Sequence, residues 1–420
     1  MSRSGPDRRR FTAGLALLGA AALARPARSQ TVGRVVVVGG GFAGATCART
    51  LREGGAEVTL LEPQATYTAC PMSNAVIAGL HGMDEQRFGY EGLRRAGIDV
   101  LAQAAVEADG REVVLADGSR LACDRVVLAP GIDLRFDALP GYDEAAAEIM
   151  PHAWKAGPQT ELLRRQLEAM PEGGTVVISV PANPYRCPPG PYERASLIAW
   201  YLKTNKPRAK LLILDGKDRF SKQGLFEAAW AELYPGLIEW VPLSAGGNVV
   251  EVDAESRTLV TEFDQHRADV ANVIPPQRAG AVALAAGVAD ASGWCPIDPV
   301  TFESRLRPGI HVIGDAAIAG AMPKSAFAAN AQAKVCAAAV VALLRGEAPQ
   351  EPRLINTCYS LVAPDYGISV AGVYRPEGGL LADIEGAGGV SPKDVPPGFR
   401  ATEATYARAW FDTITAEVFG

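Results

Sequence analysis

The sequence has few charged residues, no excess of basic residues and no repeated unit. Charged residues make up 21% of the 420-residue chain, and 47 acidic residues outnumber 41 basic ones. Without a basic stripe the chain is a poor candidate for nucleic-acid binding. No period of 20–50 residues recurs, and no paired CxxC pattern is present, so we expect no metal site. With 48% hydrophobic residues, the chain is long and apolar enough for two or three folded domains.

The N-terminal segment lacks an apolar run long enough to cross a membrane. Its apolar stretch, residues 11–24, has 14 residues, whereas a spanning helix needs roughly 20. Arginines before it and small residues after it predict a cleaved signal peptide over residues 1–30. Arg8, Arg9 and Phe11 indicate the twin-arginine type, with an ordinary secretory signal as the alternative. We therefore expect a periplasmic protein without stable membrane insertion.

Removal of that segment makes the protein more acidic. Residues 1–30 contain six arginines and one aspartate, so their loss moves the formal charge from −6 to −11. An acidic mature protein suits a basic or neutral protein partner, although charge alone identifies none.

A glycine-rich turn follows the first buried strand. Residues 32–63 predict a strand, a glycine turn, a helix and a second strand, in that order. Gly39, Gly41 and Gly44 form the pattern GxGxxG, which allows a tight turn and close approach of a pyrophosphate to the helix N-terminus. Glu62 ends the second strand, where an acid meets a ribose hydroxyl. The stretch predicts a dinucleotide site.

Two later segments indicate which dinucleotide is bound. Residues 123–132 predict a strand that runs into a Pro-Gly turn at Gly131, and residues 308–317 predict a strand that ends at Asp315. Both resemble the return motifs of FAD enzymes with two dinucleotide-binding domains. We expect Asp315 to bind the ribityl or phosphate end of FAD; an ordinary helix cap is the alternative.

The second nucleotide-type unit lacks its glycine motif. Strands are predicted at 173–180 and 209–215, with a helix over 193–205 between them. The turn after the first strand, 181–190, contains four prolines. Proline has no backbone N–H to offer a phosphate, so NADH binding is not expected there.

The predicted fold class is α/β, with two Rossmann-like dinucleotide-binding domains of the FAD/NAD(P) three-layer type and a small C-terminal α+β interface domain. The C-terminal region alternates as antiparallel strands do and ends in a helix. The predicted FAD-binding domain is discontinuous, at 31–150 and 271–350; the second domain spans 151–270 and the C-terminal domain 351–420.

The seven cysteines are an odd number, so at least one is free or bonded to another group. Cys70 lies where this fold passes near the flavin, and either a flavin link or a buried thiol is possible. Cys187 and Cys358 end strand-like runs in loop-rich settings. Joined together they would be either a structural staple or a disulfide that accepts electrons. The remaining cysteines have core positions or no evident chemistry: Cys47, Cys123, Cys295 and Cys336.

Several segments together resemble one family. They are VVVVGGGFAGATCARTL, CPMSNAVIAG, YRCPPGPYERAS, NVIPPQRAG, GIHVIGDAA, PKSAFAANAQAK and NTCYSLVAPDYGISV. The chain resembles the flavoprotein subunit of flavocytochrome c sulfide dehydrogenase over almost all of its length after residue 30. The segments that contain cysteine carry more of this resemblance than the glycine motif does.

The resemblance implies roles for particular residues. Cys70 would hold FAD through an 8α-thioether, and Cys187 and Cys358 would form a redox-active disulfide with Glu193 nearby. Lys324 would face the flavin pyrimidine, where positive charge stabilises reduced flavin. Trp410 would pack near this site.

The resemblance also implies a reaction and a partner. Sulfide would be oxidised to sulfane sulfur or polysulfide, and electrons would pass to a c-type cytochrome subunit. This chain has no CxxCH motif, so the haem would belong to the partner. Two alternatives remain open: a sulfide:quinone oxidoreductase, and a non-catalytic FAD-binding helper of another sulfur-oxidising complex.

Overall fold

The computed structural model describes residues 31–420, and the predicted signal peptide at 1–30 lies outside the described residues. The first sheet of the described part is parallel and has the strand order β20-β9-β1-β2-β5. Its strands are β1 (Arg34–Val38), β2 (Glu57–Leu61), β5 (Asp99–Leu101), β9 (Arg125–Leu128) and β20 (Ile310–Val312). Four consecutive valines of β1 are buried, as expected for a strand covered on both faces.

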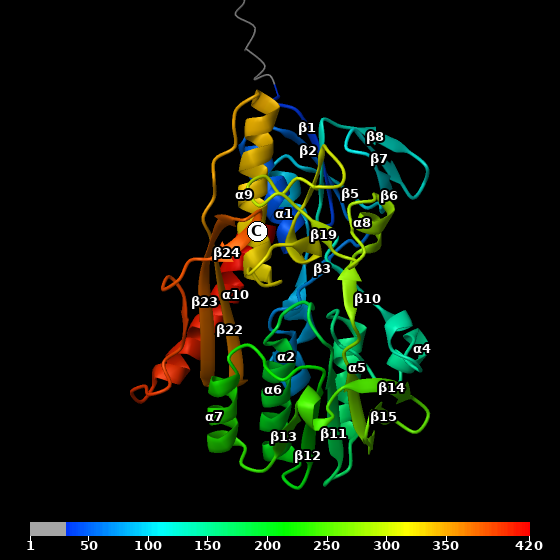
Figure 1. Ribbon diagram of the computed structural model, residues 1–420, viewed down its shortest axis with the longest axis vertical. Helices are drawn as coiled ribbons and strands as arrows, with labels where there is room; N and C mark the ends of the chain where they lie inside the picture. The colour runs from blue at the N-terminus through cyan, green and yellow to red at the C-terminus, as the bar shows by residue number, and fades with distance from the viewer. Residues whose placement is uncertain (1–30) are drawn as a thin grey trace, which may run out of the picture. The chain divides into compact units, whose positions relative to one another are not determined.

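Two long helices accompany this sheet. Helix α1 (Phe42–Glu53) and helix α9 (Ala326–Arg345) pack against each other along their length, as Figure 1 shows. By length and composition α9 is apolar enough to cross a membrane, but more than half of its most apolar stretch is buried inside the protein. We therefore describe α9 as a core helix.

The second sheet is also parallel and has the order β13-β12-β11-β17. Its strands are β11 (Thr175–Val180), β12 (Lys210–Asp215), β13 (Ile238–Val241) and β17 (Val270–Val273). Helices α5 (Pro158–Ala169), α6 (Gly190–Asn205) and α7 (Gln223–Leu233) belong to this part of the chain. Helix α6 begins three residues before its predicted start, because Pro191 stands in the first turn, where proline is tolerated.

The chain crosses between the two sheets on a two-stranded antiparallel ribbon. Strand β10 (Ile132–Leu134) pairs with β18 (Gln277–Ala279). Residues between these crossings pack with the second sheet, including Tyr142 and Met150. The predicted boundaries at 150 and 270 therefore differ from the packing. Sequence patterning locates strands, but it does not show where the chain passes from one core to the other.

The C-terminal region is an antiparallel sheet covered by a helix. Strands β22 (Leu354–Ala363) and β23 (Tyr366–Glu377) pair along their length, and β24 (Leu380–Asp383) and β25 (Gly389–Val390) flank β23. Strand β22 contacts both α6 and α9, and helix α10 (Phe399–Phe419) packs on β22 and β23. The α/β fold class and the α+β character of this region are as predicted.

The remaining elements are short. They are β3 (Tyr67–Thr68), α2 (Ser73–Ala78), β4 (Arg87–Phe88), α3 (Glu91–Arg95), β6 (Ala105–Ala108), β7 (Glu112–Leu115), β8 (Arg120–Ala122), α4 (Glu144–Ala147), β14 (Val249–Asp253), β15 (Thr258–Thr261), β16 (Gln265–Arg267), α8 (Ala281–Ala285), β19 (Cys295–Pro296) and β21 (Ala317–Ile318), together with four 3-10 turns: Met83–Gln86, Phe136–Ala138, Leu243–Ala245 and Gly314–Ala316.

Candidate flavin and cysteine site

A single cavity of about 460 Å³ collects most of the predicted site residues. Its walls come from both dinucleotide-type parts and from the C-terminal sheet. The predicted residues that line it are Gly39, Gly41, Glu62, Cys70, Gly131, Cys187, Glu193, Asp315, Cys358 and Trp410. Of the predicted residues, Gly44 and Lys324 are not part of its lining.

The glycine turn after β1 forms one end of the cavity. Gly39 has a φ of +101°, and a Cβ there would lie 2.3 Å from the carbonyl oxygen of Ala129. A Cβ on Gly44 would lie 1.8 Å from the carbonyl oxygen of Gly39, so Gly44 acts by allowing close packing behind the turn. The turn can therefore bring its backbone, and the N-terminus of α1, against a pyrophosphate.

Glu62 borders the same end of the cavity. Its carboxylate accepts backbone N–H bonds from Gly40 at 2.9 Å and from Gln64 at 3.0 Å. These two bonds fix the carboxylate beside the glycine turn, in the position where an acid meets a ribose hydroxyl.

Two buried polar atoms on cavity residues have no hydrogen-bond partner within the described chain. They are Oδ1 of Asp315 and Nε1 of Trp154. Burial raises the pKa of the Asp315 carboxyl, although the charges of Arg186 and Lys324 oppose this rise. An acceptor and a donor left unpaired on the walls of one cavity match a ligand with hydroxyl and carbonyl groups. With the glycine turn and Glu62, they fit FAD.

Cys70 lies in the turn before α2 and is half-buried. Its sulfur is 3.8 Å from the carbonyl oxygen of Trp154, on the cavity wall. Cys70 is therefore part of the wall of the cavity in which FAD fits, and the thioether remains a prediction.

Lys324 is held away from the cavity. Its amine donates to the carbonyl oxygens of Asp315 at 2.7 Å and Ala317 at 2.8 Å, and lies 3.9 Å from the ring centroid of Trp294. Burial lowers its pKa to about 8. The amine is thus bound by backbone oxygens of the segment that carries Asp315, and its predicted place at the flavin pyrimidine stays a prediction. The cavity wall beside it is formed instead by Ser325 and Ala326, at the N-terminus of α9.

Cys187 and Cys358 come from different parts of the fold and line the same cavity. Cys187 lies in the loop before α6, and Cys358 lies in β22. In this structure both are free thiols. Burial, the Glu193 carboxylate and Cys358 together raise the pKa of the Cys187 thiol well above its usual range. Their bonding as a disulfide remains a proposal.

Glu193 stands between the two cysteine-bearing segments. Its carboxylate accepts a bond from the side-chain amide of Asn74 and another from the backbone N–H of Leu361, both at 2.8 Å. Burial raises the pKa of this carboxyl, and the two hydrogen bonds oppose the rise. A raised pKa brings a carboxyl closer to the range in which it can exchange protons at neutral pH.

Backbone strain is concentrated around this cavity. Six described residues other than glycine have a positive φ, and three of them line the cavity: Met72, Ala153 and Cys187. Lys222, with φ +61°, bonds to the backbone of Cys358. Such conformations cost free energy and persist where the surrounding structure fixes them, most often at functional sites.

Several residues of the site carried no sequence signal. The Arg194 guanidinium, 2% exposed, binds Asn74 and Asn272 and the carbonyl oxygens of His152 and Ala153. An arginine in a helix follows no motif, so only the fold reveals this role. The same applies to Lys222 and to Asn356, whose side chains reach Cys358.

In the second nucleotide-type part, protein side chains occupy the position where a nucleotide ribose would meet an acid. Asp215 ends β12, where a dinucleotide fold would place an acid for a ribose. Its carboxylate instead binds Tyr192 at 2.5 Å, Lys217 at 2.6 Å and Trp240 at 2.9 Å. The ring of Phe220 stacks on Tyr192 with a centroid distance of 3.6 Å. This space is occupied by an aromatic cluster rather than by a glycine loop.

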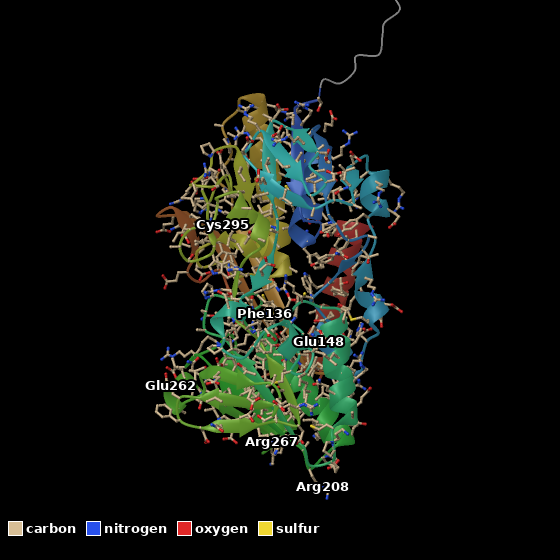
Figure 2. The ribbon with its side chains drawn as sticks, turned by 90° about the vertical axis from the view of Figure 1, so that its right-hand side faces the viewer. Phe136, Glu148, Arg208, Glu262, Arg267 and Cys295 are labelled. Atoms are coloured by element: carbon tan, nitrogen blue, oxygen red, sulfur yellow. The ribbon has the colours of Figure 1, made fainter. Side chains whose placement is uncertain are left out.

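The other cysteines lie outside the cavity. Cys47 and Cys336 are buried on α1 and α9, in agreement with their predicted core positions, and burial together with the neighbouring Cys47 raises the pKa of the Cys336 thiol. Cys123 and Cys295 are also buried, and Figure 2 shows Cys295 in the part of the protein that contains the first sheet. None of the four lines the cavity.

Comparison with known families matches this arrangement. The profile described as pyridine nucleotide-disulphide oxidoreductase matches residues 33–169. Two parallel nucleotide-type sheets that share one cavity define the class: FAD-binding flavoproteins with the fold of these oxidoreductases. Two further profiles match: "Sulfide dehydrogenase [flavocytochrome c] flavoprotein chain, central" at residues 160–275, and "Flavocytochrome c sulphide dehydrogenase, flavin-binding" at residues 350–419.

Curated relatives agree with these profiles over short stretches. The "Sulfide dehydrogenase [flavocytochrome c] flavoprotein chain" of Chlorobaculum thiosulfatiphilum is 56% identical over 45 residues, which is 10% of this chain and 94% of that one. The chain belongs to the family of flavocytochrome c sulfide dehydrogenase flavoprotein chains, as the sequence predicted. The ferredoxin reductase component of a chlorobenzene dioxygenase from Cupriavidus sp. is 35% identical over 114 residues, 26% of this chain and only 28% of that relative.

Solved structures share the fold at low identity. The sulfide:quinone oxidoreductase of Aquifex aeolicus has a TM-score of 0.72 at 17% identity, over 91% of this chain and 92% of that one. The covalent putidaredoxin reductase–putidaredoxin complex has a TM-score of 0.63 at 18% identity, over 92% and 94%. The likeness covers both nucleotide-type parts.

Proposed function

We propose that this protein oxidises sulfide to sulfane sulfur or polysulfide at Cys187 and Cys358 and passes the electrons through FAD to a c-type cytochrome subunit. The observation that carries the proposal is the meeting of these two cysteines and Glu193 on the wall of the cavity that fits FAD. A pair of cysteines beside a flavin site is the arrangement that lets a sulfur nucleophile deliver two electrons.

The chemistry begins at the oxidised cysteine pair. HS⁻ attacks one sulfur of a Cys187–Cys358 disulfide; a new S–S bond forms as the old one breaks, and the other cysteine leaves as a thiolate with the bonding electrons. Overall, one HS⁻ yields one sulfane sulfur, one proton and two electrons. Bound FAD supplies a two-electron acceptor that releases electrons singly. Loss of these electrons from the cysteines restores their disulfide.

Glu193 is the acid–base group of this proposal. Its carboxylate lies on the same cavity wall as both cysteines and is held by Asn74 and Leu361. It is placed to take the proton that HS⁻ brings. Burial raises its pKa, which strengthens the carboxylate as a base and so favours uptake of this proton.

The proposal includes covalent FAD, a partner and a compartment. Cys70 is proposed to hold FAD by a thioether, because it lines the cavity that fits FAD. The haem is placed on a separate cytochrome subunit, since this sequence has no CxxCH motif. Export by the twin-arginine route would place the complex in the periplasm.

The test mixes the purified FAD-loaded protein with sulfide in the absence of oxygen and follows the flavin absorbance. We expect rapid bleaching, followed by recovery when cytochrome c is added. A flavin that sulfide leaves unchanged would contradict the proposal and favour the non-catalytic helper. Recovery with a quinone analogue but not with cytochrome c would favour the quinone oxidoreductase.

The C-terminal helix bears on that last alternative. Phe411, Ile414 and Val418 of α10 are buried, and Trp410 lines the cavity, whereas Tyr406 is 56% exposed. The apolar side of α10 is therefore mostly packed on the protein itself and leaves little apolar surface for a membrane.

A further inference from the structure

The sulfur of Cys358 has a hydrogen-bond donor held against it. The side-chain amide nitrogen of Asn356 lies 3.3 Å from this sulfur, two residues earlier on the same face of β22. The Ser325 hydroxyl donates to the Asn356 amide oxygen at 2.6 Å. The Ser325 oxygen in turn accepts the N–H of Ala328 as the cap of α9. Ser325 thus holds the amide oxygen, and the amide nitrogen lies nearer to the sulfur than that oxygen does, at 3.3 Å against 3.8 Å.

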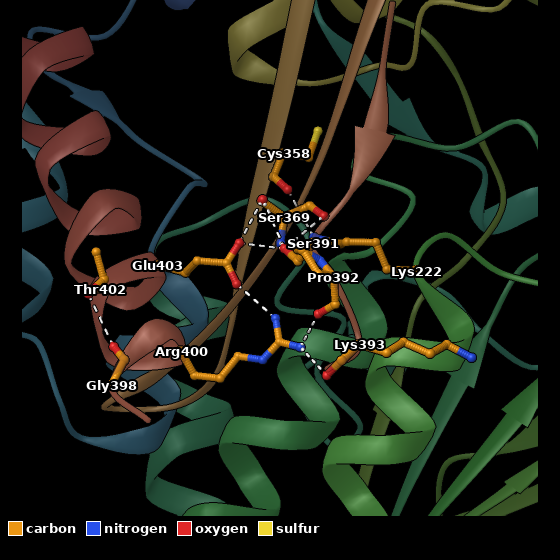
Figure 3. A network of polar contacts seen from close by, with 10 residues as sticks. All are labelled: Lys222, Cys358, Ser369, Ser391, Pro392, Lys393, Gly398, Arg400, Thr402 and Glu403. Atoms are coloured by element: carbon orange, nitrogen blue, oxygen red, sulfur yellow. Dashed lines mark hydrogen bonds and ion pairs between the residues drawn. The ribbon is translucent and has the colours of Figure 1, made fainter. Parts of the chain in front are cut away.

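A buried cation lies behind the same strand. Lys222 is 7% exposed, and its amine donates to the carbonyl oxygen of Cys358 at 3.0 Å and to the hydroxyl of Ser360 at 2.7 Å. Both partners are neutral. Figure 3 shows the Lys222 side chain reaching the strand that carries Cys358. A buried ammonium is costly unless an anion offsets its charge.

The nearby carboxylate of Glu403 is bound by groups other than Lys222. Glu403 accepts bonds from Ser369 and Ser391 and pairs with Arg400 at 2.9 Å, as Figure 3 shows. Within the described residues, no carboxylate lies within 4.0 Å of the Lys222 amine. Lys217, the neighbouring buried lysine, differs because Asp215 lies 2.6 Å from its amine.

Cys187 differs in its net surroundings. Burial first, and then the Glu193 carboxylate and Cys358, raise the pKa of its thiol, although the charges of Arg186 and Lys222 oppose this rise. The titratable groups that face Cys358 are Cys187 and Glu193 from the α6 side, Lys222 at the start of α7 and Tyr374 from β23. Of these, only Lys222 carries positive charge.

We propose that Asn356 and Lys222 together form a thiolate-holding site for Cys358, with Asn356 donating to the sulfur and Lys222 supplying the buried positive charge. The thiolate formed when the cysteine pair opens is thereby stabilised at Cys358 and not at Cys187. Burial lowers the pKa of Lys222 to about 8, while the thiolates and Glu193 oppose this change, so its charge is present at neutral pH. The catalytic importance of this site rests on the proposed function, but its effect on the thiol does not.

The test measures thiol ionisation directly, without sulfide. The FAD-loaded protein is reduced with a phosphine and alkylated with iodoacetamide at a series of pH values, and peptide mass spectrometry gives the rate for each cysteine. In the wild type we expect Cys358 to react at lower pH than Cys187. The variants Lys222→Met and Asn356→Leu should raise the half-reaction pH of Cys358 by one unit or more, which is about a tenfold lower rate at lower pH.

Matched variants separate charge from packing. Lys222→Arg keeps the charge and should keep the rate within about threefold of the wild type. Lys206→Met removes a lysine that also donates to two carbonyl oxygens, those of Glu168 and Met170, away from the cavity, and should change nothing. If Asn356→Leu does not fold, Asn356→Ser and Lys222→Met decide the question.

Two results would overturn the inference. One is a Cys358 profile unchanged in both folded variants; the other is a wild type in which Cys187 ionises first. Neither depends on sulfide, so a protein whose flavin ignores sulfide can still confirm or refute the thiolate site.

Discussion

The backbone N–H of Leu361 donates to the carboxylate of Glu193 at 2.8 Å. This bond joins α6, which follows Cys187, to β22, which carries Cys358. Because Asn74 holds the other carboxylate oxygen, the acid is fixed by two segments that are distant in sequence. The relative position of the two cysteines therefore depends on the charge and geometry of this one side chain.

Replacement of either reactive cysteine should stop electron entry. In Cys187→Ser or Cys358→Ser protein with full FAD content, the rate of flavin bleaching by sulfide should fall by about 10³-fold or more, because the sulfur that is attacked or that leaves is missing. Stopped-flow absorbance measures this. Cys123→Ser, outside the cavity, serves as the control, and a normal rate in either of the first two variants would refute the mechanism.

Cys70 should hold FAD covalently. Acid precipitation of the wild type should give a yellow pellet, whereas Cys70→Ser should give a colourless pellet with FAD in the supernatant. Mass spectrometry of the pelleted protein gives the same answer by mass. A colourless wild-type pellet would exclude the thioether.

Glu193 should make stability fall as the pH rises. Burial raises its pKa in the folded protein above the ordinary value of about 4.3. Between these two pKa values the folded protein binds the proton and the unfolded chain has released it, so the free energy of unfolding decreases with increasing pH, by about 1.4 kcal/mol for each unit of the rise. Glu193→Gln removes this dependence.

Urea denaturation of wild type and variant from pH 4 to pH 8 tests this expectation. The stability of Glu193→Gln relative to the wild type should increase toward pH 8. Glu232→Gln, at an exposed position on α7, should show no such trend. A relative stability independent of pH would mean that the Glu193 carboxyl is not perturbed.

Arg194 should be a large stability determinant. Arg194→Met removes the donor to the side-chain oxygens of Asn74 and Asn272 and to the carbonyl oxygens of His152 and Ala153, of which His152 keeps a bond from Asn272. We expect a loss of about 3–5 kcal/mol, the range found when one partner of a buried charged network is removed. Urea unfolding measures it, with exposed Arg165→Met as the control; a loss below about 1 kcal/mol would contradict the assigned role.

NADH should not reduce the flavin. The proline turn and the aromatic cluster around Asp215 leave neither a phosphate cradle nor a free acid for a ribose. Under anaerobic conditions the flavin absorbance should stay unchanged with NADH or NADPH. Saturable bleaching by either nucleotide would show that the second part still binds it.

Local sequence patterns predicted the nucleotide folds well. Gly39, Gly44 and Glu62 can be predicted from the sequence, because their roles depend on neighbours within one strand–turn–helix unit. The domain boundaries are harder to predict from the sequence, because β17 and residues 139–150 pack with the second sheet through contacts that are distant in sequence. No local pattern records where a chain leaves one core for another.

The residues of the cysteine site could not be predicted from local sequence patterns alone. The pairing of Cys187 with Cys358 in a disulfide is predicted from family resemblance alone, because two cysteines so far apart in the sequence carry no local signal that they pair. Lys324 was predicted at the flavin; its amine is bound to the backbone carbonyls of Asp315 and Ala317, and its role there stays a prediction. Asn356 and Lys222 were missed because a side chain's direction on a strand or at a helix start follows from tertiary contacts.

The aromatic cluster around Asp215 also bears on which electron donors and acceptors we expect this protein to use. The pyridine nucleotide-disulphide oxidoreductase profile matches part of this chain, but here aromatic side chains pack around the acid that ends β12. Tyr192, Phe220 and Trp240 pack around the Asp215 carboxylate, so we expect a flavin in this protein to exchange no electrons with the NADH/NAD⁺ couple. In the proposed function, a second part without a nucleotide site would leave electrons from the cysteines no route to NAD⁺, so they would leave through a different partner.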